Sequence, residues 1–144
     1  MRRAILFAAT FVMMACAKQP INAGGSVGAG SSRAAVETFM AAVKATDLQA
    51  MSTIWGNEKG PGRDQFKRDE LEKRLIVMQC LLQHDRYAFQ DDTPQLQTGG
   101  RQSWPLQITR KRVTARTKLT TVRGPGGRWF LTDADLAPLR DLCT

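Results

Sequence analysis

The chain has 144 residues, of which 42% are hydrophobic, so there is room for one domain with one modest core and not for several domains. Its 21 basic and 13 acidic side chains give a formal charge of +8. Removal of Arg2 and Arg3 with a leader would reduce this excess, but the surface would stay basic without forming a nucleic-acid-binding arm.

The N-terminus predicts export. A positively charged start, M-R-R, precedes an unbroken run of small and apolar residues over positions 4–15. This run is too short to span a bilayer, which needs about 20 residues, but it suits the hydrophobic region of a signal peptide. The run ends in M-M-A-C, which resembles the lipobox of bacterial lipoproteins. We therefore expect residues 1–16 to be a signal peptide that ends at a lipidated Cys16.

Two outcomes of processing stay open. Lipidation of Cys16 would anchor the protein to a membrane. Ala17 then stands where Asp would retain a lipoprotein in the inner membrane, which by analogy with enteric lipoproteins indicates the outer membrane, facing the periplasm. Ordinary cleavage at the A-x-A pattern of residues 15–17 would instead release a soluble periplasmic protein. Residues 17–32 are rich in Gly, Ser and Ala and have no period, which predicts a flexible linker.

Two short helices are predicted at the start of the folded part. Ser31 or Ser32 can cap a helix over residues 33–45. A shorter helix follows, with Trp55 on its apolar side, and Gly56 ends it. The next segment is rich in glycine and proline and is predicted to be a loop.

The longest helix is predicted over residues 69–83. Acidic side chains occupy its first turn, where the helix dipole favours negative charge. From residue 75 onward the helix is apolar on nearly every side, which predicts that more than one face is covered. Its main apolar stripe recurs at helical spacing and consists of Leu71, Leu75, Met78 and Leu82.

The rest of the chain is predicted to form strands. Pro105 cannot donate to a strand ladder, so we expect a sheet edge or a bulge at that position. A G-P-G-G sequence marks a hairpin turn over residues 124–127. The final segment, residues 134–142, is expected to pack its leucines inward. Alternating apolar side chains place the strands over residues 84–90, 104–109, 113–119 and 128–132.

Helices that precede the strands, rather than alternating with them, indicate an α+β fold with N-terminal helices packed on an antiparallel sheet. The helix pair of residues 35–56, A-V-E-T-F-M-A-A-V-K-A-T-D-L-Q-A-M-S-T-I-W-G, and the hairpin of residues 122–132, V-R-G-P-G-G-R-W-F-L-T, resemble the nuclear-transport-factor-two-like family. That family includes ketosteroid isomerases, SnoaL-like cyclases and bacterial envelope lipoproteins of unknown role. The resemblance implies a cone-shaped domain with a curved sheet, which we assign to residues 33–144.

The residue types predict no catalytic, cofactor or metal site. The chain has one histidine, His84, and too few cysteines beside Cys16 for a zinc site of familiar spacing. His84 is expected to be exposed at a helix end. The family's isomerases combine a buried carboxylate base with a tyrosine-centred oxyanion hole. Tyr87 is the only tyrosine, and the carboxylates nearest to it in sequence, Asp85 and Asp91, fall near strand ends.

Two functions stay open. The first is a non-catalytic, membrane-tethered envelope lipoprotein domain that binds a small apolar ligand or a partner protein; nucleic acid is not expected as a partner. The second is a cone-fold enzyme, isomerase- or cyclase-like, acting on a small hydrophobic substrate. A buried carboxylate in a pocket would favour the enzyme, and a cone filled by aromatic side chains would favour the binding domain. The residues expected to line a pocket are Tyr87, Trp55, Trp104 and Trp129.

Cys80 and Cys143 are predicted to form a disulfide. Lipidation or cleavage removes Cys16, which leaves an even pair in an exported domain, where disulfides persist. Cys80 lies on the opposite side of the long helix from its main apolar stripe. The C-terminal leucines can cover that side, and this docking brings Cys143 to Cys80. Two separate buried thiols are the alternative.

Basic side chains gather on the predicted hairpin of residues 110–123. They can face anionic lipid headgroups or another polyanion. They can also form a solvated outer face that discourages edge-to-edge pairing, which is the interpretation the sequence favours. The set consists of Arg110, Lys111, Arg112, Arg116, Lys118 and Arg123.

Overall fold

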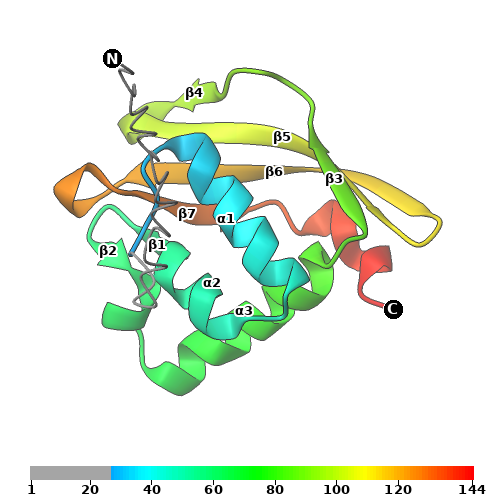
Figure 1. Cartoon of the computed structure of the whole chain (residues 1–144), viewed down its shortest axis with the longest axis horizontal. Coiled ribbons are helices and arrows are strands. Elements are labelled where there is room, and N and C mark those ends of the chain that lie inside the picture. Colours follow the sequence, from blue (N-terminus) through cyan, green and yellow to red (C-terminus); the bar gives the residue numbers. More distant parts are fainter. Residues whose placement is uncertain (1–26) are drawn as a thin grey trace, which may run out of the picture.

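Three α-helices cover one face of a five-stranded antiparallel sheet in the computed structural model, which describes residues 27–144 (Figure 1). This arrangement confirms the predicted α+β class, and the sheet is neither closed nor strongly curled. The helices are α1 (Ser32–Lys44), α2 (Leu48–Ile54) and α3 (Arg68–Leu82). The strands of the sheet are β3 (Arg86–Phe89), β4 (Gln95–Gln97), β5 (Arg101–Arg110), β6 (Val113–Arg123) and β7 (Trp129–Ala134).

The predicted signal peptide, Cys16 and the linker up to residue 26 lie outside the described residues. The last linker residues are described and lie against β7. Ala29 exchanges two backbone hydrogen bonds with Trp129, at 2.8 and 2.9 Å. Ser32 is already the first residue of α1. Helix α1 and the backbone contacts to β7 therefore begin before residue 33.

Side-chain caps decide where the first two helices begin. The Ser31 hydroxyl accepts a hydrogen bond from the Ala34 N–H at 3.1 Å, and the Asp47 carboxylate accepts one from the Ala50 N–H at 2.9 Å. Of the two serines that could cap α1, Ser31 is therefore the cap. Thr46, with φ of 57°, turns the chain out of α1 into this second cap.

A small hairpin replaces the loop predicted after α2. It consists of β1 (Gly56–Asn57) and β2 (Gly60–Pro61), which pair antiparallel. The strands approach so closely that a Cβ atom on Gly56 would collide with the Gly60 backbone, so glycine is required there. Four short 3₁₀ segments complete the described part of the chain: η1 (Gly62–Asp64), η2 (Thr98–Gly100), η3 (Pro125–Gly127) and η4 (Ala137–Leu142).

Helix α3 buries the predicted stripe but not the rest of its apolar surface. All four stripe residues are buried, as expected. Ile76 and Val77, however, are 52% and 54% exposed, so the expectation that α3 is covered on nearly every side is wrong for them. The reason is the reach of the C-terminal segment: η4 is fixed at Cys80, one turn beyond Ile76.

Pro105 occupies an interior strand without breaking its pairing to β6. On the other side of β5, β3 pairs as far as Leu106 and β4 begins at Ser103. The Pro105 carbonyl faces that break, where it accepts the Gln90 N–H at 2.9 Å. Since the N–H and C=O of a strand residue point the same way, the missing N–H also faces the break. The sequence therefore predicted a local edge correctly, although β5 itself is interior.

The core fills the space between the helices and the sheet. Aliphatic side chains of β5, β6 and β7 alternate inward and meet the apolar faces of α1 and α3. The largest of these side chains are less than 2% exposed and leave the inner face of the sheet covered. They include Phe39, Met40, Leu75, Leu82, Leu106, Ile108, Leu119 and Leu131.

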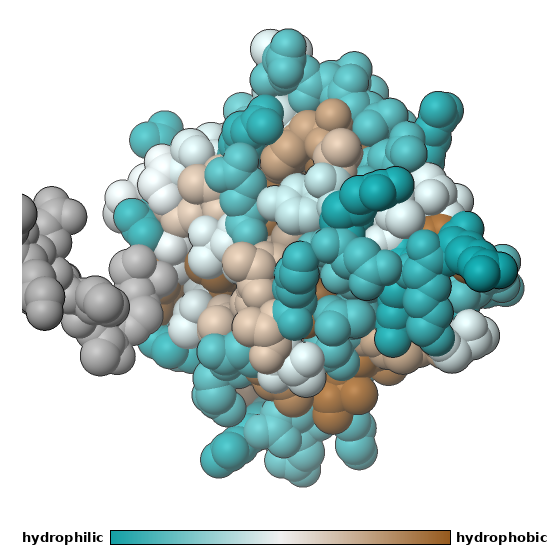
Figure 2. All heavy atoms as spheres, turned by 45° about the vertical axis from the view of Figure 1, so that its right-hand side comes forward, coloured by the Kyte–Doolittle hydropathy of each residue, from teal (hydrophilic) through white to brown (hydrophobic). Residues whose placement is uncertain are grey.

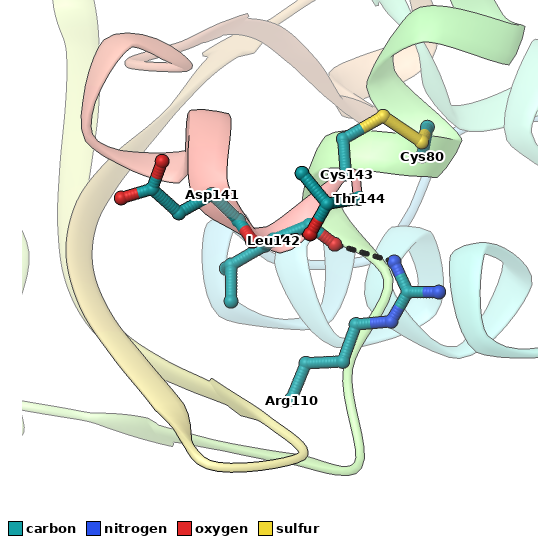
Figure 3. The surroundings of a disulfide bond; sticks show 6 residues. All are labelled: Cys80, Arg110, Asp141, Leu142, Cys143 and Thr144. Carbon is teal, nitrogen blue, oxygen red and sulfur yellow. Dashed lines mark hydrogen bonds between the residues drawn. A yellow bond between two sulfur atoms is a disulfide. The ribbon is translucent and has the colours of Figure 1, made fainter.

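The C-terminal segment is pinned to α3 as predicted. Cys80 and Cys143 form a disulfide with a Cα–Cα distance of 5.2 Å (Figure 3). Leu139 and Leu142 of η4 are buried, and Arg110 donates a hydrogen bond to the Leu142 carbonyl oxygen. Disulfides persist in oxidising compartments, so this bond indicates a location outside the cytoplasm.

Candidate functional site

An apolar hollow of about 440 Å³ lies between α3 and the end of β7, and we name it the α3–β7 groove. The hydropathy surface shows apolar atoms at the lower edge of the molecule, at the level of α3 (Figure 2). Charged side chains stand beside the apolar ones in the groove. Its lining consists of Trp55, Lys73, Arg74, Val77, Met78, Asp133, Ala134 and Leu136.

Trp55 is held in the groove by its backbone. It follows α2 directly, and its backbone forms a parallel bridge to Leu131 of β7. Its carbonyl oxygen accepts the Gly62 N–H at 2.6 Å, and its ring lies 6.3 Å from that of Phe39. These contacts fix the half-buried indole against the core, so the groove has a preformed aromatic wall.

The other apolar walls come from α3 and the C-terminal segment. Val77 is more than half exposed, and its neighbour Met78 is buried as part of the core. Leu136 is half-buried at the start of η4, where its carbonyl accepts the Leu139 N–H at 3.1 Å. Because the Cys80–Cys143 bond holds η4 against α3, it also stabilises this wall.

Of the three charged side chains that line the groove, one forms an ion pair and two do not. Arg74 is engaged: its Nη2 lies 2.9 Å from a Glu70 carboxylate oxygen, and its guanidinium lies 5.0 Å from the centre of the Phe66 ring. Lys73 and Asp133, by contrast, make no ion pair within residues 27–144. The groove thus offers an apolar bed with one free cation and one free carboxylate beside it.

The structure does not bring the four predicted pocket residues to one cavity. Trp55 lines the α3–β7 groove, and Tyr87 lines a separate hollow of about 340 Å³ beside α1. Trp104 is buried on β5, where its indole N–H donates to the Ser32 hydroxyl at 2.8 Å. Trp129 is half-buried at the edge strand β7, against Ala29.

Tyr87 and Trp104 nevertheless belong to one row of rings. The centroids of His84 and Tyr87 are 5.2 Å apart, those of Tyr87 and Phe89 are 5.9 Å apart, and those of Phe89 and Trp104 are 5.2 Å apart. Each pair meets edge to face, the arrangement that the ring quadrupoles prefer. The Arg33 guanidinium lies 4.0 Å over Phe89 and closes the row. The row joins β3 and β5 to the start of α1.

His84 is buried, so the expectation of an exposed ring is wrong. The chain turns out of α3 at Gln83 and brings the ring against Tyr87, with Nδ1 2.9 Å from the Leu82 carbonyl oxygen. A carbonyl only accepts, so Nδ1 carries the proton. Burial lowers the pKa of His84, and the positive charge of Lys44 lowers it further.

The Tyr87 hollow places a tyrosine and a carboxylate together. Burial raises the pKa of Tyr87, and the negative charge of Glu37 raises it further. Glu37 itself is exposed, and its carboxylate lies 3.0 Å from Arg33 Nε. A base that abstracts a proton inside an apolar pocket needs a carboxylate shielded from water, and Glu37 is in water.

Sequence reasoning missed most residues of the α3–β7 groove. Val77 carried a usable signal, because it is apolar and lies off the main stripe of α3, which left it without an assigned partner. Asp133 and Leu136 carried none, because only the tertiary packing of β7 against α3 brings them there.

Comparisons of this chain with protein-family models, curated proteins and solved structures find no match. Within residues 27–144, no group of three or more His, Cys, Asp and Glu side chains is placed to hold a metal ion. No helix in the same range combines the length and the apolar character needed to cross a bilayer.

Proposed function

We propose that this protein is a non-catalytic, lipid-anchored domain of the bacterial cell envelope that binds a small apolar ligand in the α3–β7 groove. The groove itself carries the proposal. Its volume, about 440 Å³, falls in the range of small-molecule sites, and its walls are a fixed indole, Val77 and Leu136. A free cation and a free carboxylate beside an apolar bed suit a ligand with an apolar body and a polar end.

The proposed location is the outer membrane, with the domain facing the periplasm. The lipobox-like sequence at Cys16 supports anchoring. The Cys80–Cys143 disulfide supports an oxidising compartment. The order of the elements also supports the proposed relationship to nuclear-transport-factor-two-like envelope lipoproteins: a helix pair comes first, then a short hairpin, a long helix and antiparallel strands.

The cone-fold enzyme is the weaker candidate. Every Asp and Glu within residues 27–144 is exposed except Glu72, which is half-exposed and lies 2.9 Å from Arg68. The inner face of the sheet, where a cone would hold its substrate, is filled by core side chains. Both observations favour binding at the α3–β7 groove over proton transfer inside the fold.

Fluorescence titration with N-phenyl-1-naphthylamine, an uncharged apolar probe, tests the groove in the full chain. Val77→Asp places a charge on the wall and should weaken probe binding at least tenfold. Ile76→Asp is the matched control, because Ile76 is as exposed as Val77 but does not line the groove. Equal affinities of the two variants, or no probe binding by the wild type, would reject the groove.

Fractionation of the producing cells tests the anchor separately. Cys16→Ser should move the protein from the membrane fraction into the soluble fraction, because it removes the lipid attachment site. A wild-type protein that is already fully soluble in the periplasm would reject lipidation and favour cleavage after Ala17.

A further inference from the structure

The positive charge of the described chain is concentrated in one segment. Residues 86–123, which contain β3 to β6, hold eight basic and two acidic side chains. The other described residues hold ten basic and eleven acidic side chains, close to neutrality. The net charge of the domain is therefore carried by the sheet and not by the helical layer.

Pairing register places two of these cations, Arg116 and Lys118, on the face of the sheet that the helices leave uncovered. Arg116 is opposite Gln107 and Lys118 is opposite Pro105, and cross-strand partners share a face. Leu106 and Leu119, adjacent to them in sequence, point inward and are fully buried. The helices lie on that inner side (Figure 1).

The same face continues onto β3 and the hairpin. Arg86 is opposite Thr109, which is opposite Thr114 in turn, so Arg86 shares the outer side. Lys111 and Arg112 form the exposed turn between β5 and β6. We name the set the outer basic face: Arg86, Lys111, Arg112, Arg116 and Lys118.

None of the side chains of the outer basic face forms an ion pair within residues 27–144, although the Asp85 carboxylate accepts the Lys111 backbone N–H at 2.6 Å and Asp135 lies beside Arg116 and Lys118. All four ion pairs of the described chain lie in α1, α3 and η1, between Arg33 and Glu37, Arg63 and Asp64, Arg68 and Glu72, and Arg74 and Glu70. Arg116 and Lys118 stand two residues apart on one strand face, about 7 Å, so they repel each other. An external anion would relieve this repulsion.

Edge protection alone does not fix where these side chains point. Charges that prevent edge-to-edge pairing belong on edge strands. β7 pairs with β6 only from Leu119 to Arg123, so Arg116 and Lys118 lie where β5 is the one strand partner of β6. Their side chains share the outer face with Gln107 and Pro105, and both are exposed to solvent there.

We propose that the outer basic face docks on the anionic phospholipid headgroups of the membrane that carries the protein. The proposal rests on the lipid anchor of the proposed function. Eleven residue steps separate Cys16 from Val27, a length of at most about 40 Å. The Val27 carbonyl oxygen accepts a hydrogen bond from Arg128, which lies next to β7. From β7 to β3 the sheet is three strand spacings wide, about 14 Å. The anchored chain is long enough to lay this face on the membrane.

Lysine footprinting of the purified full chain on vesicles tests the docking. The vesicles are either phosphatidylcholine alone or phosphatidylcholine with about one-third phosphatidylglycerol, and amine modification is read by mass spectrometry. Lys111 and Lys118 should be protected on the anionic vesicles only, and high salt should remove the protection. Lys59 and Lys67, outside the outer basic face, are internal controls that should react equally on both.

Charge-neutralising variants sharpen the test. Each basic residue near an anionic surface strengthens binding about fivefold. Arg116→Gln with Lys118→Gln should therefore weaken docking about 25-fold and return Lys111 to its reactivity on neutral vesicles. Lys59→Gln with Lys67→Gln removes the same charge elsewhere and should change nothing. Equal effects of the two pairs would overturn the proposal.

The outcome separates docking from anchoring. A chain without an anchor fails to float with neutral vesicles, whatever its outer basic face does. A chain that floats with both kinds of vesicle but shows equal reactivity of Lys111 and Lys118 on both is anchored and does not dock. Protection of these lysines in native envelope membranes, but not on protein-free anionic vesicles, would assign the face to a protein partner and overturn the lipid proposal.

Discussion

Trp104 on β5 donates its indole N–H to the hydroxyl of Ser32 in the first turn of α1, at 2.8 Å and across 72 residues of chain. The Ser32 hydroxyl also lies 2.6 Å from Thr121 Oγ1, and Thr121 donates to the Gln102 carbonyl oxygen at 3.2 Å. An indole N–H only donates and a carbonyl oxygen only accepts, so all three protons point the same way along this chain. Ser32 thus joins the helical layer to two strands through one buried hydroxyl.

Loss of that hydroxyl should be costly. Ser32→Ala leaves the Trp104 N–H without an acceptor in a buried site, which should lower the free energy of unfolding by about 1–3 kcal/mol. Urea unfolding of Ser32→Ala, Trp104→Phe and the double variant gives the coupling energy between the two sites. We expect the Ser32→Ala effect to shrink once the indole N–H is gone. Strictly additive effects would contradict the hydrogen bond.

The Cys80–Cys143 bond should contribute strongly to stability. It links residues 63 positions apart, and closing a loop of this length in the unfolded chain is worth about 4 kcal/mol on chain-entropy grounds. Reduction should therefore lower the urea midpoint of the wild type, while the double variant Cys80→Ser with Cys143→Ser should not respond to reductant. Thiol labelling of unfolded, unreduced protein taken from the envelope should find neither cysteine free; two free thiols per chain would refute the bond.

The sequence was a good guide to elements whose pattern is local. The apolar stripe of α3, the alternation of β5 and the glycine-rich turn before β7 each depend on residues close together in the chain. Even the long-range disulfide was predictable, because Cys80 and Cys143 had no other partner once Cys16 was set aside. The β1–β2 hairpin was not, since its strands are two residues long.

Features that depend on what covers a surface escaped prediction. His84 follows the end of α3 and looked exposed, but the chain turns and places the ring against Tyr87. Val77 was expected to be covered, but it is 54% exposed and lines the α3–β7 groove together with Leu136. The groove needs α3, Trp55 and Leu136 at once, and nothing in a single stretch of sequence specifies that three-way packing.

Replacement of Phe130 by Ala should lower the free energy of unfolding much more than replacement of its neighbour Trp129. Phe130 is 1% exposed, with Gly28 and Gly124 so close to its ring that neither could carry a Cβ. Phe130→Ala should cost about 3–5 kcal/mol. Trp129→Ala should cost clearly less, because this indole is half-buried and leaves no closed cavity. Urea denaturation of both variants measures the difference, and equal losses would contradict the placement of the two rings on β7.

As the pH falls, protonation of His84 should lower the stability of the fold before the carboxylates become protonated. Burial, with the charge of Lys44, lowers the pKa of this ring; the Leu82 hydrogen bond and Asp85 oppose the shift. The unfolded chain takes up a proton near the usual value of 6.5, whereas the folded ring resists it. Stability is therefore complete above about pH 6.5 and falls as the pH drops below it toward the folded pKa.

The chain has one histidine, so the effect can be assigned without ambiguity. Thermal unfolding between pH 7.5 and 5.5 should show a lower melting temperature at the acid end, and the ring proton signals of His84 in NMR spectra should titrate below pH 6.5. His84→Gln, which is neutral throughout this range, should remove most of the pH dependence even if it lowers stability overall. A melting temperature that stays flat in the wild type, or a ring that titrates above pH 6.5, would mean that the imidazole is solvated and that the packing of His84 against Tyr87 does not hold in solution.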